Sequence, residues 1–327
     1  MSADVLSAVR QALPRLSAAE ARVARVIMDD PARMVDLTIT ELAALCDSSQ
    51  ATVARFCQGL GYSGYRDFRL AVAAATSREQ VTRERFELTE SEIDPADTVQ
   101  EVVAKIAYQE VLAIEQTAKE LDVETLDKVA AAIVSAPRVD VYGAGSSSLT
   151  AQDLQQKLSR IGITAFCTAD SHLALSSAAL QKPGNVAIGV SHSGLTAETN
   201  HALAVAHAAG ATTVAITNFP DSRIADECDF VLTTQARESL YRSGAMASRI
   251  AQLALVDFLF VRIAQQLYDQ MTESLRLTYE AVKSQRLAPE RHGERHPERH
   301  RGSSGASTQP DTKSATGGAG APDASVG

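Results

Sequence analysis

The clearest indication of the fold is the segment Asn185-Val186-Ala187-Ile188-Gly189-Val190-Ser191-His192-Ser193-Gly194-Leu195-Thr196. Its first half is a short apolar run typical of a buried β-strand, and its second half is a polar turn at which a helix begins. Backbone N–H groups at a helix start attract anions, hydroxyl side chains donate hydrogen bonds to them, and a glycine lets the backbone approach closely. The stretch therefore predicts a strand, a turn and a helix that together hold the phosphate of a small phosphorylated molecule.

The same alternation of strand and helix continues from Arg138 onward. Short β-branched runs occur at residues 138–142, 163–167, 186–190, 212–216 and 229–233. The stretches between them suit helices, and the segment from Ser248 to Gln270 suits one long closing helix. Such a rhythm is typical of an α/β domain: a five-stranded parallel sheet flanked by helices on both faces, with right-handed crossovers.

A second serine-rich turn, Tyr142-Gly143-Ala144-Gly145-Ser146-Ser147-Ser148, follows the first predicted strand. Its two glycines resemble a dinucleotide-binding turn, but Ser148 replaces the third glycine, and Asp170 comes too late to be the acidic residue that ends the second strand. Both serine-rich turns leave the carboxyl ends of parallel strands, where ligands bind in open α/β sheets. We therefore expect the two turns to share one ligand.

The first 76 residues are expected to form closely spaced helices without strands. Thr38-Ile39-Thr40-Glu41 has the form of a capping box, and Asp47-Ser48-Ser49 is a short polar turn before a helix over Gln50–Leu60. Two short helices joined in this way fit helix–turn–helix geometry, although a purely structural helical hairpin has the same pattern. The side of the second helix that is expected to face solvent carries side chains suited to base edges and phosphates, namely Ser49, Gln50, Thr52 and Arg55.

Two family resemblances bear on these alternatives. The run from Thr52 to Tyr65, TVARFCQGLGYSGY, closely resembles the N-terminal domain of the RpiR family of bacterial transcription regulators, and the match covers roughly residues 5–76. Ser48 departs from the pattern, because the family usually has an apolar residue there. Residues 120–270 resemble the sugar isomerase (SIS) domain, with further matches at DLQQKL (153–158) and SRIAQ (248–252).

The resemblance implies operator DNA as a partner of the helical domain. For the SIS domain it implies a phosphosugar held by Ser147, Ser191, Ser193 and Thr196, with Ser146 and Ser148 as neighbours. Lys157 and Arg249 either add positive charge at this site or pair with surface carboxylates.

Catalysis needs a general base near the sugar. His192, Glu198 and Glu238 are candidates, but Glu198 equally suits the first turn of a helix, and the three form no convincing acid–base set. We therefore expect a regulator of carbohydrate metabolism rather than an enzyme, with operator affinity controlled by a phosphosugar and without a cofactor or metal. The alternative is a phosphosugar isomerase or lyase with an accessory helical domain.

Composition and charge agree with this hypothesis. The chain has 327 residues, of which 45% are hydrophobic, and no apolar run approaches the roughly 20 residues that span a bilayer. Residues 1–85 carry 11 basic against 10 acidic side chains, whereas residues 86–327 carry 20 against 30. Any contact with nucleic acid is therefore expected in the first part.

The expected organisation is a DNA-binding domain over residues 1–76, a linker over 77–97 and a SIS domain with leading helices over 98–275. Residues 288–327, with the repeated Glu-Arg-His triplets at 290–300, are expected to be a disordered tail rather than a metal site. The four cysteines lack metal-ligand spacing and the N-terminus lacks a signal peptide, so we expect reduced thiols in a cytoplasmic protein. Helix–turn–helix proteins generally bind DNA in pairs, which predicts a homodimer or homotetramer.

Overall fold

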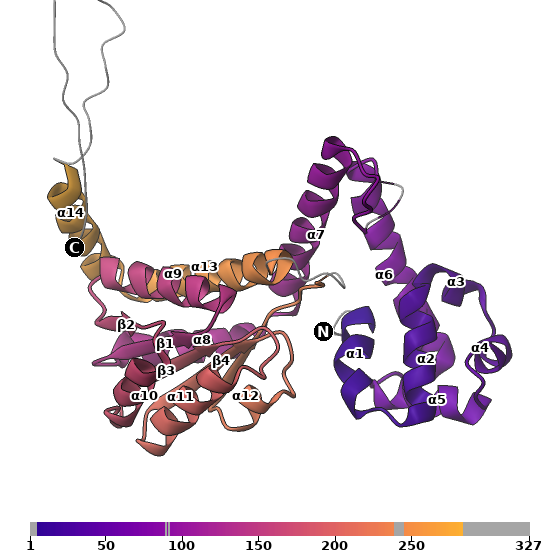
Figure 1. Ribbon diagram of the computed structural model, residues 1–327, viewed down its shortest axis with the longest axis horizontal. Helices are drawn as coiled ribbons and strands as arrows, with labels where there is room; N and C mark the ends of the chain where they lie inside the picture. The colour runs from indigo at the N-terminus through magenta and orange to yellow at the C-terminus, as the bar shows by residue number, and fades with distance from the viewer. Residues whose placement is uncertain (1–4, 89, 91, 239–244, 284–327) are drawn as a thin grey trace, which may run out of the picture. The chain divides into compact units, whose positions relative to one another are not determined.

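The computed structural model describes residues 5–88, 90, 92–238 and 245–283 of the chain (Figure 1). Its N-terminal part is helical, as the sequence predicts. The elements are α1 (Val5–Ala12), the 3-10 turn η1 (Leu13–Arg15), α2 (Ala18–Asp29), α3 (Pro31–Asp36), α4 (Ile39–Leu45), α5 (Gln50–Gly59) and α6 (Tyr65–Arg85).

The helix–turn–helix unit consists of α4, a polar turn and α5. The predicted capping box is confirmed: the Thr38 hydroxyl accepts from the Glu41 N–H, and the Glu41 carboxylate accepts from the Thr38 N–H. Phe56 of α5 is 1% exposed and meets Phe68 of α6 edge-on, with ring centroids 5.8 Å apart. One apolar core therefore fixes the angle at which α5 presents its other side.

The C-terminal part is built on five parallel strands, which confirms the predicted sheet. They are β1 (Val139–Gly143), β2 (Ala165–Cys167), β3 (Val186–Val190), β4 (Thr212–Thr217) and β5 (Phe230–Thr233), in the order β2-β1-β3-β4-β5. The helices of this part are α7 (Val99–Glu120), α8 (Val123–Ser135), α9 (Ser146–Arg160), α10 (Ser171–Ala179), α11 (Ala197–Ala208), α12 (Arg223–Asp226), α13 (Met246–Gln266) and α14 (Tyr268–Lys283).

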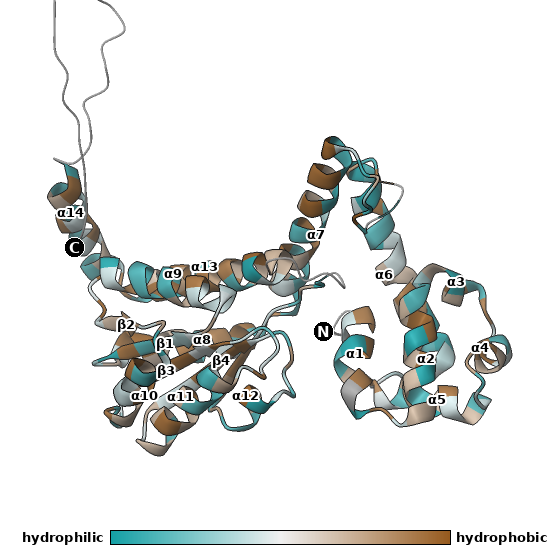
Figure 2. Cartoon of the chain, in the orientation of Figure 1, coloured by the Kyte–Doolittle hydropathy of each residue, from teal (hydrophilic) through white to brown (hydrophobic). Residues whose placement is uncertain are grey.

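Alternate residues of the strands point to two different helical layers. Val186, Ile188 and Val190 pack with α8, α9 and α13, whereas Ala187 packs with α10, α11 and α12. Figure 1 shows α9 and α13 on one side of the sheet and α10, α11 and α12 on the other. In Figure 2 hydrophobic and hydrophilic residues alternate along α9 and α13, as they do on helices with one buried side. The period of two along each strand thus produces the three layers.

Two helix boundaries differ from those that the sequence predicts. The helical domain expected to end at residue 76 continues as α6 to Arg85, so residues 77–85 of the predicted linker are helix. The long closing helix instead ends at Gln266, and α14 follows at an angle of 109°. The predicted tail, residues 288–327, lies outside the described residues.

Over the described ranges no single helix is long and apolar enough to cross a membrane, although α13 and α14 together meet that test of length and composition.

Candidate functional site

A polar cavity of about 270 Å³ lies where the chain leaves the carboxyl ends of β1 and β3. These strands are neighbours in the sheet, so the two serine-rich turns meet as predicted. We call this cavity the hydroxyl cradle; its lining residues are Ala144, Gly145, Ser146, Ser147, His192, Ser193, Thr196 and Ala245.

The cradle brings together four of the six residues predicted to bind a phosphosugar: Ser146, Ser147, Ser193 and Thr196. Ser191 lies outside the lining: it is 1% exposed and its Oγ is 3.0 Å from Thr196 Oγ1, so it supports Thr196. Ser148 donates to the Gly145 carbonyl oxygen at 2.7 Å and lines a neighbouring cavity. Four residues of the predicted set therefore line the cradle directly, whereas Ser191 and Ser148 form hydrogen bonds beside it.

Four lining residues of the cradle lie outside the predicted set: Ala144 and Gly145 of the first serine-rich turn, His192 and Ala245. His192 lies between Ser191 and Ser193 and was weighed only as a catalytic base, and Ala245 precedes α13, more than 45 positions further along the chain. The position of His192 inside the turn was a signal for it, whereas no local pattern marks Ala245.

The positive potential in the cradle comes from the N-terminal ends of two helices. α9 begins after Gly145 and α11 begins after Thr196, and neither helix has a side chain that caps its first N–H groups. Both helix starts carry the positive end of the helix dipole, although the Ser147 and Ser148 N–H groups of α9 already donate to the Ala144 and Gly145 carbonyl oxygens at 3.2 and 3.1 Å. None of the described lining residues is a lysine or an arginine. The cradle thus suits an anion held by N–H groups and hydroxyls rather than by an ion pair.

Gly194 lets the second turn fold tightly. Its φ is +65°, and a Cβ there would lie 1.9 Å from Ser222 Oγ. Gly143 has a similar role at the end of β1, since a Cβ would meet the Ser147 carbonyl oxygen at 2.8 Å. Both turns therefore need glycine for close approach of the backbone.

The buried side-chain amide of Gln252 orients the Ser147 hydroxyl through a hydrogen bond. Gln252 of α13 is 1% exposed; its Nε2 donates to Ser147 Oγ at 3.4 Å and its Oε1 accepts from Thr150 Oγ1 at 3.2 Å. With Ser147 Oγ accepting from the amide, its own hydrogen is left to donate into the cradle. The sequence match at 248–252 contained Gln252, but its role depends on the tertiary structure.

Of the candidate catalytic groups only His192 lines the cradle; Glu198 lines a neighbouring cavity, and Glu238 lines neither of the two. The Glu238 carboxylate accepts from the Ser248 N–H at 2.7 Å, at the start of α13. Lys157 forms ion pairs with Asp153 and Asp257, so it pairs with carboxylates as in one of the two predicted alternatives. Arg249 and Lys157 do not line the cradle.

The second candidate site is the outer side of α5. Ser49, Gln50 and Arg55 are exposed, although the Ser49 hydroxyl also caps α5 by accepting from the Thr52 N–H at 3.1 Å. The prediction that Thr52 faces solvent is wrong. Thr52 is 7% exposed and its Oγ1 lies 2.9 Å from Ser49 Oγ, because it stands one helical turn before the buried Phe56.

The exposed side of α5 also includes Ala51 and Gln58. With Arg55, these residues follow the helical period of three and four, and that spacing was a signal in the sequence for Gln58. The turn before α5 contains Ser48, whose Oγ is buried and has no hydrogen-bond partner within the described ranges. The departure from the family pattern therefore leaves an unsatisfied hydroxyl under the helix–turn–helix unit.

Comparisons with known proteins agree with this two-part architecture. Residues 3–79 match the family described as helix-turn-helix domain, rpiR family, and residues 132–262 match the SIS domain. A protein of Caldanaerobacter subterraneus subsp. tengcongensis named as an uncharacterized HTH-type transcriptional regulator is 36% identical, over 87% of this chain and 99% of that protein.

Two solved structures extend the comparison. The Vibrio vulnificus NanR protein, solved as a complex with ManNAc-6P, is 29% identical with a TM-score of 0.56, and the match covers 87% of this chain and all of that one. A putative sugar-phosphate isomerase from Listeria monocytogenes has a TM-score of 0.52 over 57% of this chain and 100% of its own. At 21% identity the latter likeness concerns the fold alone.

Proposed function

Since this chain belongs to the rpiR family of helix-turn-helix transcriptional regulators, we propose that α5 binds operator DNA and that a phosphosugar in the hydroxyl cradle controls operator affinity. One observation carries the proposal: two uncapped helix starts and four hydroxyl side chains line one cavity in a chain that also has an exposed helix–turn–helix unit. The relative NanR, solved with a phosphorylated sugar, supports the same ligand class.

DNA binding follows from the exposed side of α5. Arg55 can donate two parallel hydrogen bonds to a guanine edge, and Gln50 and Gln58 can pair with adenine. The Ser49 hydroxyl is already used as a cap, so its contribution is to present the helix N-terminus to a phosphate. Thr52 lies on the buried side of α5 and is proposed to make no base contact.

The DNA proposal is tested with operator fragments that the full chain selects from a random DNA pool. Arg55→Ala is expected to weaken binding to the selected site about 5- to 150-fold, which corresponds to about 1–3 kcal/mol for a bidentate base contact. Arg160→Ala on α9 removes the same charge from an exposed position outside the helix–turn–helix unit and is the control. Equal affinity of Arg55→Ala and the parent, measured by fluorescence anisotropy, contradicts the assignment.

The sensing proposal is tested by adding sugar phosphates to the same DNA titration. The effective sugar phosphate is expected to change operator affinity of the parent chain and to have no effect on Ser193→Ala. Circular dichroism checks that Ser193→Ala is folded, because the chain has no tryptophan. A full response in Ser193→Ala contradicts the role of the cradle.

We further propose sensing rather than turnover, because Glu238 is engaged at the start of α13 and the cradle has no acid–base pair among its described residues. Mass spectrometry and NMR of sugar phosphates incubated with the chain test this point, and formation of an isomer or cleavage product contradicts it. The regulator is proposed to act in the cytoplasm as a homodimer or homotetramer, which suits paired half-sites one helical turn apart. Light scattering measures that assembly.

A further inference from the structure

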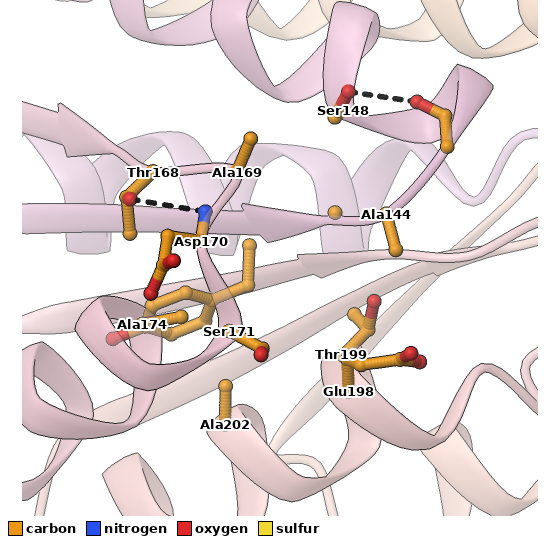
Figure 3. Close-up of a pocket in the computed structure, with 13 residues that line it drawn as sticks. Ala144, Ser148, Thr168, Ala169, Asp170, Ser171, Ala174, Glu198, Thr199 and Ala202 are labelled. Atoms are coloured by element: carbon orange, nitrogen blue, oxygen red, sulfur yellow. Dashed lines mark hydrogen bonds between the residues drawn. The ribbon is translucent and has the colours of Figure 1, made fainter.

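A second cavity, of about 190 Å³, adjoins the hydroxyl cradle (Figure 3). We call it the acidic cavity. Both cavities are lined by Ala144 and Gly145, so they lie on either side of one turn. A single water needs only about 10–15 Å³ of such space, so the acidic cavity can hold part of a larger ligand.

Thr199 is the first indication that the acidic cavity binds something. It is 2% exposed, lines the cavity, and its Oγ1 has no hydrogen-bond partner in the described part of the chain. Figure 3 shows its oxygen directed from α11 toward Ala144. Buried hydroxyls in folded proteins are nearly always hydrogen-bonded. A hydroxyl or amino group of a ligand would supply the partner for Thr199.

The charge of the acidic cavity restricts what that ligand group can be. Two carboxylates line it, Asp170 and Glu198, and its described lining has no lysine, arginine or histidine. Asp170 stays in place because its Oδ1 accepts from the Leu173 N–H at 2.8 Å. Burial raises the pKa of Tyr142, so its phenol is neutral, and its hydroxyl donates to Asp140 Oδ2 at 3.3 Å. The remaining polar groups are the hydroxyls of Ser148, Thr168, Ser171 and Thr199.

A second phosphate or a carboxylate would meet these two like charges close to the cavity wall. Asp170 and Glu198 are both exposed, so water screens part of this repulsion, and the remainder disfavours a second anion at this end of the ligand. Neutral hydroxyl groups can donate to the carboxylates, and an ammonium group gains an ion pair as well.

We propose that the acidic cavity is the subsite for the unphosphorylated end of the effector, and that it selects monophosphorylated neutral or amino sugars over sugar acids and bisphosphates. Thr199 accepts or donates a hydrogen bond to that end, and Glu198 sets the charge selection. This inference rests on the proposed function, because the phosphate has to occupy the hydroxyl cradle.

The test is calorimetric titration of the full chain with matched probes: glucose 6-phosphate and glucosamine 6-phosphate against 6-phosphogluconate and glucose 1,6-bisphosphate. At least one of the first two is expected to bind ten-fold or more tightly than both of the others. Glu198→Gln is expected to reduce that ratio at least five-fold. Glu124→Gln, which removes a first-turn glutamate from α8, is the charge control and is expected to leave the ratio unchanged.

Thr199→Val keeps the branched shape and removes the hydroxyl. It is expected to lower the binding affinity for the preferred probe at least five-fold. Inorganic phosphate needs only the hydroxyl cradle and is expected to bind with unchanged affinity. Equal affinity for acids, bisphosphates and neutral sugars in the parent overturns the proposal. An unchanged ratio in Glu198→Gln overturns it as well, even if Thr199→Val fails to fold.

Failure of the proposed function has a different signature. Two results would show that the hydroxyl cradle is not a phosphate site. Either inorganic phosphate and all four probes fail to bind the parent chain, or they bind Ser193→Ala as tightly as the parent. In both cases both proposals are contradicted. If phosphate binding depends on Ser193 but the four probes show no charge selection, only the acidic cavity proposal falls.

Discussion

Gln252→Leu tests whether the buried Gln252 amide orients the Ser147 hydroxyl in the hydroxyl cradle. Gln252 links two hydroxyls, those of Thr150 and Ser147, and all but 1% of its surface is buried. Leucine fills a similar volume without the amide. The substitution therefore removes two hydrogen bonds and leaves the packing of α13 against α9 nearly intact.

The expected loss of stability comes from Thr150. Its hydroxyl is fully buried, and losing the partner at 3.2 Å costs about 1–3 kcal/mol in the free energy of unfolding. For a domain of this size that lowers Tm by about 2–4 °C per kcal/mol. Thr150→Val leaves the Gln252 Oε1 without that donor and is expected to cost a similar amount. The double variant replaces both partners by apolar groups and is expected to regain most of the loss.

The effect on ligand binding is expected to differ from the effect on stability. Without the amide, the Ser147 hydroxyl is no longer oriented, and a hydrogen bond to a charged group is worth about 1.5–3 kcal/mol. Loss of that bond weakens the binding of a sugar phosphate by about ten-fold to 150-fold. The double variant also lacks the amide, so it regains stability but not affinity.

The assay combines thermal unfolding followed by circular dichroism with calorimetric titration of the tightest-binding sugar phosphate. Parental affinity in Gln252→Leu would refute the role of the amide in positioning Ser147. Recovery of affinity in the double variant would refute it equally, because packing alone would then account for the loss.

Three further outcomes are expected. Ser48→Ala removes a buried hydroxyl without a partner among the described residues and should raise the free energy of unfolding by about 1–3 kcal/mol in a urea titration; no gain contradicts that view of the turn. Gly194→Ala should lower Tm and abolish phosphate binding, because the new Cβ would overlap Ser222. Gly184→Ala is the control: its φ is also left-handed but its Cβ meets no other atom, so it should lower the free energy of unfolding by only about 1–2 kcal/mol. Hydrogen bonds from the backbone N–H and hydroxyl of the α4 N-cap hold the pKa of Glu41 below its ordinary value, so its stabilising effect is present above that value and is lost as the pH falls through the lowered pKa. Glu41→Gln should remove this part of the dependence of Tm on pH below the ordinary glutamate pKa of 4.5, and parallel curves for the two chains contradict it.

Much of the fold could be predicted because its signals are local. The capping box at Thr38 and Glu41 and the apolar run at 186–190 depend on residues within a few positions of one another, and both appear in the structure as expected. The helix boundaries were harder to predict. α6 continues to Arg85 through a charged stretch whose weak apolar period gave no helical signal, and α13 gives way to α14 after Gln266 without a proline or glycine to mark the break.

Local patterns in the sequence were enough to predict two serine-rich turns after two parallel strands and a helix–turn–helix unit before them. Which hydroxyls line the hydroxyl cradle depends on how the elements pack together. Ser191 and Thr52 have polar side chains that the packing turns inward, and Gln252 reaches Ser147 across 105 positions of the chain. The physical reason is the range of the forces: caps and periodicity act within one or two helical turns, whereas a side chain's partner across the core depends on how whole elements pack.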